Sequence, residues 1–153
     1  MIGGYKVITL CGSSRFKDAF MQVQKRLTLE GNIVLSLGLF GHSGDTEVWE
    51  GMDEGTITKT KMMLDDIHKR KIDMADEVYF IDVKGYMGES TKSEFEYAKA
   101  NHKIIKFYSK PEMIIDEVGG VHDCAIGWNP NGLWCGECTK ISCKNCSSRM
   151  TVR

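Results

Sequence analysis

Two carboxylates flank one short turn near the middle of the chain. Asp82 closes a strand-like run at residues 77–82, and Glu94 opens a helix-like run at residues 94–98. The turn between them is rich in small and hydroxyl residues, namely Gly85, Gly88, Ser90, Thr91 and Ser93. Open α/β sheets bind ligands at the carboxyl ends of their strands, where a helix N-terminus offers free N–H groups and a positive dipole end. The pattern therefore predicts an anion-binding loop beside a reactive carboxylate.

A second group of reactive side chains lies near the end of the chain. Two CxxC pairs occur there, and each pair can hold one edge of a tetrahedral Zn2+ ion through its thiolates. We therefore expect a structural zinc ion, and no organic cofactor, with the ligands Cys135, Cys138, Cys143 and Cys146. Because only four residues separate the pairs, His122 or Cys124 could replace one ligand. The alternative interpretation is a tail of unligated cysteines.

Alternating strand and helix patterns must position these groups. Strand-like runs occupy residues 5–11, 32–37, 77–83 and 103–108, and helical spacing of apolar residues covers 16–31, 56–75 and 91–102. A long Gly-rich loop spans 38–55, and a short helix is expected after Pro111, up to residue 118. The pattern predicts an α/β fold with a flavodoxin-like or Rossmann-like, three-layer parallel sheet in which the first strand is central. We expect this domain over residues 1–118 and a small Cys-rich metal-binding appendage over 119–153.

Composition narrows the class of protein. The net charge is -1, so no overall basic field attracts nucleic acid, although the tail is locally basic and permits such a contact. No apolar run approaches the roughly 20 residues of a membrane span, and the first residues lack a signal-peptide pattern. Five of the six cysteines crowd the tail instead of spreading over the chain. We therefore expect a cytoplasmic protein that does not contact a membrane.

Two segments resemble the nucleoside 2-deoxyribosyltransferase superfamily. One is the run Cys11-Gly-Ser-Ser-Arg15 after the first strand, and the other is Asp82 followed by the Gly/Ser loop and residues 94–98. Within the superfamily, the pattern is more similar to the 2'-deoxynucleoside 5'-monophosphate N-glycosidases. The resemblance covers about residues 6–108. Where many relatives carry an Asp on the second helix, this chain has His68, with Asp65 and Asp66 just upstream.

The resemblance implies a role for each matching residue. Glu94 is the expected nucleophile, and Asp82 is expected to touch the departing base or its sugar. The residues expected to grip a 5'-phosphate or 5'-hydroxyl are Gly12, Ser13, Ser14, Arg15, Gly88, Ser90 and Ser93. His42, on the long loop, and His68 complete the predicted substrate site. A homodimer or larger assembly is also implied, because relatives complete their pockets across subunits.

The chemistry can be argued from the residues themselves. Cleavage of an N-glycosidic bond develops positive charge at C1', which a nearby carboxylate stabilises or captures as a glycosyl-enzyme. Glu94 suits that role, and we expect the helix N-terminus to keep it ionised at neutral pH. The leaving base needs a proton from Asp82, a histidine or a bound water.

Each candidate also has a purely structural interpretation. Residues 91–94 form a capping box, in which the Thr91 hydroxyl and the Glu94 carboxylate would bind their own backbone. Asp82 could only start a turn, and Arg15 could be a solvated helix residue. His68 lies on an apolar line, which is typical of a packed histidine. Cys11 is expected to be a small buried residue.

Three functions remain open. The first is an enzyme that cleaves or transfers the N-glycosidic bond of a nucleoside or nucleoside 5'-monophosphate. The second is a binding or sensing module that holds a nucleotide without turnover and docks a partner through its zinc tail. The third is another phosphoribosyl-handling enzyme with a Rossmann-like fold; the absence of a GxGxxG run after the first strand disfavours dinucleotide binding.

Overall fold

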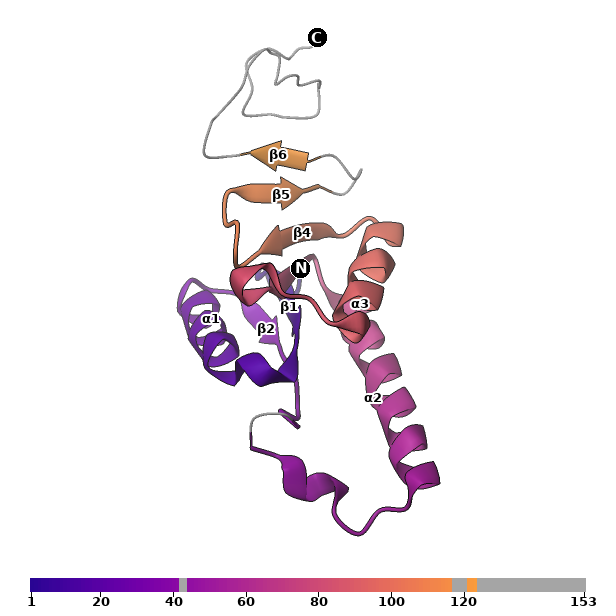
Figure 1. Cartoon of the computed structure of the whole chain (residues 1–153). Coiled ribbons are helices and arrows are strands. Elements are labelled where there is room, and N and C mark those ends of the chain that lie inside the picture. The colour runs from indigo at the N-terminus through magenta and orange to yellow at the C-terminus, as the bar shows by residue number, and fades with distance from the viewer. Residues whose placement is uncertain (42–43, 117–120, 124–153) are drawn as a thin grey trace, which may run out of the picture. The chain divides into compact units, whose positions relative to one another are not determined.

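The computed structural model describes residues 1–41, 44–116 and 121–123. The chain divides into two compact units, Met1–Ser109 and Lys110–Arg153. All helices and the parallel strands described below belong to the first unit (Figure 1). Within the described residues, none of the helices combines the length and the apolar character needed to cross a membrane.

The first unit is built on a parallel sheet. Its strands are β1 (Val7–Gly12), β2 (Ile33–Leu35), β3 (Glu77–Ile81) and β4 (Ile104–Phe107), in the order β2-β1-β3-β4. Each pair of neighbours runs parallel, with Thr9 opposite Leu35 and Val78 on its two sides. The predicted α/β class and the parallel pairing of these four strands are thereby confirmed, and β1 lies inside the sheet, between the edge strand β2 and β3.

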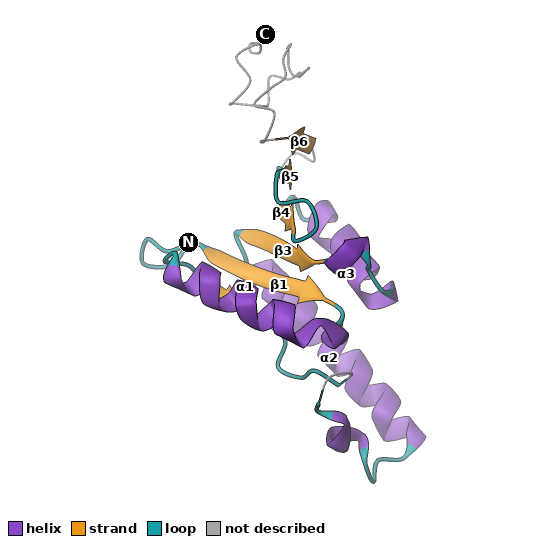
Figure 2. Ribbon diagram, turned by 60° about the vertical axis from the view of Figure 1, so that its left-hand side comes forward, coloured by secondary structure: helices purple, strands orange, loops and turns teal. Residues whose placement is uncertain are grey.

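Helices cover both faces of this sheet. The helix α1 (Lys17–Leu29) lies on one face, and α2 (Glu54–Met74) and α3 (Glu89–Ala100) lie on the other (Figure 2). Side chains along β1 alternate between the faces, as the pleat of a strand requires. Ile8 and Leu10 join the core cluster with Phe20 of α1, whereas Thr9 donates a hydrogen bond to the Lys71 carbonyl of α2. The result is the three-layer arrangement that the sequence predicts.

The loops between strands and helices contain short 3-10 helices and one buried aromatic residue. The 3-10 helices are Ser14–Phe16, Thr46–Trp49 and Val83–Gly85. In the long loop after β2, Phe40 is 5% exposed and packs edge-on against Phe20, with ring centroids 5.4 Å apart. The backbone N–H of Phe40 also donates to Asp45 at 2.7 Å. This anchor attaches one end of the loop to the core.

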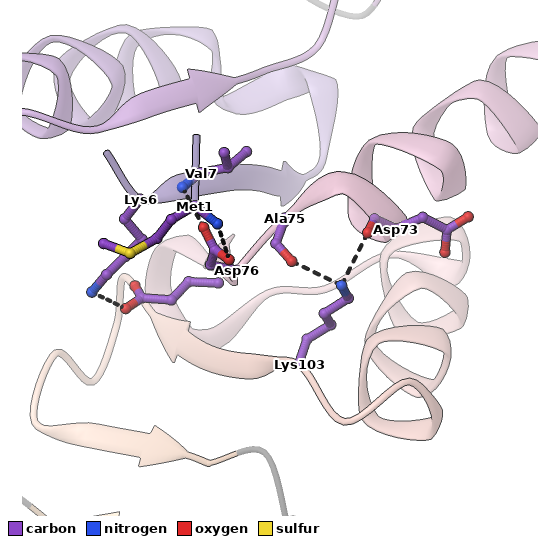
Figure 3. A network of polar contacts seen from close by, with 8 residues as sticks. Met1, Lys6, Val7, Asp73, Ala75, Asp76 and Lys103 are labelled. Atoms are coloured by element: carbon purple, nitrogen blue, oxygen red, sulfur yellow. Dashed lines mark hydrogen bonds and ion pairs between the residues drawn. The ribbon is translucent and has the colours of Figure 1, made fainter. Parts of the chain in front are cut away.

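A polar network joins the amino ends of β1 and β3, at the edge opposite to the predicted site (Figure 3). The Asp76 carboxylate accepts hydrogen bonds from the Val7 N–H at 2.8 Å and from the terminal amine of Met1 at 2.9 Å. Lys103 donates to the Asp73 and Ala75 carbonyls at the end of α2. These bonds satisfy helix-end and strand-end groups that would otherwise lack partners.

The start of one helix and the type of one element differ from the sequence prediction. The helix α3 begins at Glu89, with Gly88 as its N-cap, two residues earlier than expected. The short helix expected after Pro111 is wrong: the second unit has β5 (Met113–Ile115), paired antiparallel with β6 (Val121–Asp123). The β-branched pair Ile114 and Ile115 favours a strand, and the segment is too short for a helix to gain much from propagation.

Candidate functional site

A cavity of about 600 Å³ lies at the carboxyl ends of β1 and β3. Residues from the turn after β1, the loop after β2, the middle of α2 and the start of α3 line it. Seven predicted site residues are brought together on its wall: Gly12, Ser13, Ser14, Arg15, Gly88, Ser90 and Glu94. This is the edge at which parallel α/β sheets bind their ligands.

The turn after β1 brings backbone close to the neighbouring strand. A Cβ atom on Gly12 would lie 2.8 Å from the Ile81 carbonyl oxygen, so only glycine fits between β1 and β3 here. Ser13 then caps the following 3-10 helix by accepting a hydrogen bond from the Arg15 N–H. The tight turn therefore places two serines and an arginine directly at the cavity.

Arg15 is exposed, but its side chain has defined partners. Its Nε donates to the Ser13 hydroxyl at 3.1 Å, and its guanidinium lies 4.7 Å from the ring centroid of Tyr86. Tyr86 belongs to the turn after β3, and both residues line the cavity. Stacking leaves the edge of a guanidinium available for an anionic group. The positively charged Arg15 side chain is thus held at the cavity, and none of its described contacts is with an acidic residue.

Glu94 does not take part in a capping box. Because α3 begins at Glu89, both Thr91 and Glu94 lie within the helix, and the Lys92 N–H bonds to the Gly88 carbonyl. Thr91, Glu94 and Ala98 form the buried face of α3. The Glu94 side chain is 8% exposed and lines the cavity. A capping box at residues 91–94 would require Thr91 to be the N-cap of α3, whereas the N-cap is Gly88, so the capping interpretation is wrong.

The expected ionisation of Glu94 is also wrong. Burial, together with the negative charge of Asp65, raises the pKa of Glu94 to about 8. The helix dipole acts mainly within the first turn, whereas Glu94 lies beyond that turn, so desolvation outweighs it. At neutral pH Glu94 is therefore mostly a neutral carboxylic acid.

Cys11 and His68 lie behind Glu94 and were not grouped with it by the sequence. The Cys11 Sγ is 3.3 Å from Nε2 of His68, and one donor atom from each of Cys11, His68 and Glu94 lies within 4.8 Å of the others. Burial lowers the pKa of His68 to about 4, with the Lys71 ammonium adding to the effect. Burial also raises the pKa of the Cys11 thiol. The available signal was strand alternation, which turns Cys11 toward α2.

Asp82 lies outside the cavity lining. Both of its carboxylate oxygens accept hydrogen bonds from Ser109, one from the backbone N–H at 2.8 Å and one from the hydroxyl at 2.7 Å. The residue is 6% exposed. Asp82 thus joins the end of β3 to the segment that follows β4.

The other predicted residues have different positions. His68 sits behind Glu94 and does not line the cavity, and Ser93 is exposed on α3 and does not line it either. His42 and the four tail cysteines, Cys135, Cys138, Cys143 and Cys146, lie outside the described residues.

Sequence reasoning missed several cavity residues from α2 and from the loops. Lys61, Leu64 and Asp65 come from one stretch of α2, and Leu37 and Leu39 follow β2. Trp49, from the long loop after β2, also lines the cavity. The three leucines and Trp49 give the cavity apolar and aromatic surface in addition to its serines and Arg15. Only the tertiary arrangement reveals that Asp65 and Glu94 share one cavity.

Comparison of the chain with protein-family models, with curated proteins and with solved structures found no match.

Proposed function

We propose that the protein cleaves or transfers the N-glycosidic bond of a nucleoside or nucleoside 5'-monophosphate, with 2'-deoxyribose as the expected sugar. The observation that carries the proposal is the buried Glu94 carboxyl group, which lines a cavity shared with Arg15 and three serines. The resemblance to 2'-deoxynucleoside 5'-monophosphate N-glycosidases points to the same residues.

The cavity offers a distinct environment for each part of such a substrate. Arg15, Ser13 and Ser14 would bind the 5'-phosphate together with free N–H groups at the start of α3, where Ser90 also lines the wall. Trp49 and the leucines after β2 would pack against the base. This placement leaves the sugar beside Glu94.

The reaction would proceed through a covalent intermediate. In its ionised form, the Glu94 carboxylate attacks C1', the C1'–N bond breaks, and its electron pair leaves with the base, which takes up a proton. Water or a second base then attacks C1' and releases Glu94. Hydrolase and transferase activity differ only in that second acceptor.

Asp65 is the better candidate for the residue that contacts the departing base. Asp82 was expected to touch the base, but Ser109 occupies both of its oxygens and it does not line the cavity. Asp65 lines the cavity from α2 and interacts electrostatically with Glu94. We therefore assign contact with the departing base to Asp65.

A second candidate is a nucleotide-binding module that does not turn its ligand over. The observation that favours it is the pKa of Glu94, about 8, which leaves the carboxyl group protonated and able to donate a hydrogen bond at neutral pH. In this alternative the Cys-rich tail docks a partner.

Three further proposals, on the metal, the assembly and the cellular compartment, rest on the sequence analysis alone. We propose that the tail binds one structural Zn2+ ion through Cys135, Cys138, Cys143 and Cys146, that the chain forms a homodimer or larger assembly, and that it acts in the cytoplasm. Zinc content measured before and after joint substitution of Cys135→Ser and Cys138→Ser tests the tail: the loss of one ion per chain supports the site, and unchanged content removes it.

A panel of nucleosides and 5'-monophosphates, monitored for free base, tests the catalytic proposal. Wild type, Glu94→Gln and Glu96→Gln are compared, because Glu96 is an exposed glutamate on the same helix. Base release by wild type and Glu96→Gln, but not by Glu94→Gln, supports the enzyme. Tight nucleotide binding without base release supports the binding module instead.

A further inference from the structure

Three metal-binding side chains meet behind the cavity, and the proposed reaction uses only one of them. Cys11 comes from β1, His68 from α2 and Glu94 from α3. They are 0%, 5% and 8% exposed, respectively. The Sγ of Cys11 and Nε2 of His68 are 3.3 Å apart, and one donor atom from each of the three residues lies within 4.8 Å of the others.

We propose that Cys11, His68 and Glu94 bind one divalent transition-metal ion of the Zn2+ type, with a fourth coordination position open to the cavity. Bonds of about 2.0 to 2.3 Å in tetrahedral geometry place donor atoms about 3.3 to 3.8 Å apart. The Cys11–His68 distance already fits, and the other donor spacings need a closure of at most about 1 Å. Glu94 lines the cavity, so a water molecule can reach the fourth position.

The chemistry of the donors selects the class of ion. Thiolate, imidazole and carboxylate together suit Zn2+ and its neighbours in the first transition series. Mg2+ and Ca2+ prefer sites made entirely of oxygen, which this cluster does not offer. Three protein ligands with one open position is the arrangement of exchangeable or catalytic zinc, in contrast to a closed four-cysteine site.

Charge also balances in the occupied cluster. The Cys11 thiol and the Glu94 carboxyl group release their protons to solvent, while His68 binds through a nitrogen lone pair. The two resulting negative charges neutralise the ion, so no net charge is left in this buried position. No oxidation state changes.

The consequence for catalysis rests on the proposed function. An ion that holds a Glu94 oxygen prevents its attack on C1', so Zn2+ should inhibit base release. The ion-binding test itself is run without nucleotide, so its failure and the failure of the glycosidase proposal are separate results.

The test uses the full chain with the other five cysteines, at positions 124, 135, 138, 143 and 146, changed to serine. Cys11 is then the only thiol, and Co2+ serves as a visible probe. We expect one equivalent of Co2+ to produce a thiolate-to-cobalt charge-transfer band and the visible absorption of a tetrahedral site.

Matched histidine variants show which side chain is the ligand. His68→Asn should weaken Co2+ binding by at least about 100-fold, since loss of even an outer-shell partner costs roughly 10- to 100-fold. His102→Asn should leave binding unchanged, because His102 is exposed at the end of α3 and its φ of 57° suits asparagine. Circular dichroism checks that each variant is folded.

Absence of the charge-transfer band in the folded five-serine chain would overturn the proposal. If that chain does not fold, the zinc content of wild type and Cys11→Ser decides instead. The proposal predicts one ion fewer per chain in Cys11→Ser, whatever the tail binds, and equal content would reject it.

Discussion

The Cys11 Sγ lies 3.3 Å from Nε2 of His68, and this pair supports the Glu94 carboxyl group from behind. The three residues come from β1, α2 and α3, so the position of Glu94 depends on the packing of two helices against the central strand. A buried carboxyl group with a raised pKa at a cavity wall is typical of a functional site. A local cap would have needed none of this tertiary structure.

Gly12→Ala should destabilise the protein by about 1 to 3 kcal/mol, the usual cost of overpacking. The added Cβ would lie 2.8 Å from the Ile81 carbonyl oxygen, and backbone cannot move aside as a flexible side chain can. Gly38→Ala is the control, because a Cβ there meets no atom within 4 Å. Urea unfolding measures both variants, and equal stability would show that β1 and β3 can separate at this point.

Asp82→Ala should reduce the free energy of unfolding by about 1 to 3 kcal/mol, because the Ser109 N–H loses its partner at a partly buried site. The KM for nucleotide should change little in the folded fraction, since Asp82 does not line the cavity. Asp65→Asn provides the contrast, with slower base release and wild-type stability. If Asp82→Ala raises KM strongly while stability is unchanged, Asp82 contacts substrate after all.

Much of the fold could be predicted from the sequence, because the apolar residues of β1 and α1 recur at the spacing typical of a strand and of a helix, respectively. Phe20, Val23 and Leu27 are buried as their helical spacing requires. The start of α3 could not be predicted, because Thr91 and Glu94 also fit a capping box and only the structure shows Gly88 as the N-cap.

The part of the site formed by residues adjacent in the sequence could be predicted, whereas the part formed by tertiary packing could not. Residues adjacent in the sequence, such as Ser13, Ser14 and Arg15, reach the cavity together. Asp65 and the Cys11–His68 pair depend on how α2 lies across the sheet, which local spacing does not determine. The pKa of Glu94 depends on burial, which is a tertiary property as well.

The contribution of Glu94 to the stability of the protein should fall as the pH rises from about 4.5 to about 8. Glu94 has an ordinary pKa of 4.5 when unfolded and about 8 when folded, so the folded state binds more protons across this window. Its contribution is complete below the lower pKa and lost as the pH passes the upper one. His68 acts in the opposite direction between pH 4 and 6.5, because burial lowers its pKa from 6.5 to about 4, so the unfolded state binds the extra proton there and stability rises with pH.

The variant Glu94→Gln removes this pH dependence. Between pH 5 and pH 9, wild type should lose on the order of a few kcal/mol more than Glu94→Gln in unfolding free energy, at about 1.4 kcal/mol per pKa unit. Denaturant unfolding in the presence of a chelator measures the difference. Glu96→Gln should follow wild type, and parallel curves for wild type and Glu94→Gln would show that Glu94 titrates normally.

Arg15→Met should separate phosphorylated from unphosphorylated substrates. Loss of the guanidinium should raise the KM for a 5'-monophosphate by roughly 10- to 100-fold, as expected for a charge-assisted contact of about 1.5 to 3 kcal/mol. The KM for the matching nucleoside should stay within about twofold, since uniform binding energy is lost only where the phosphate is present. An equal effect on both substrates would place Arg15 outside the phosphate site.

Attack of the Glu94 carboxylate on an anomeric carbon can be followed through base release in a single turnover. Wild type, in excess over substrate, is mixed with each 5'-monophosphate in turn, and free base is measured beside Glu94→Gln and Glu96→Gln. We expect base release by wild type and Glu96→Gln, with a loss of at least about 1000-fold in folded Glu94→Gln. Base release by Glu94→Gln at the wild-type rate would contradict it.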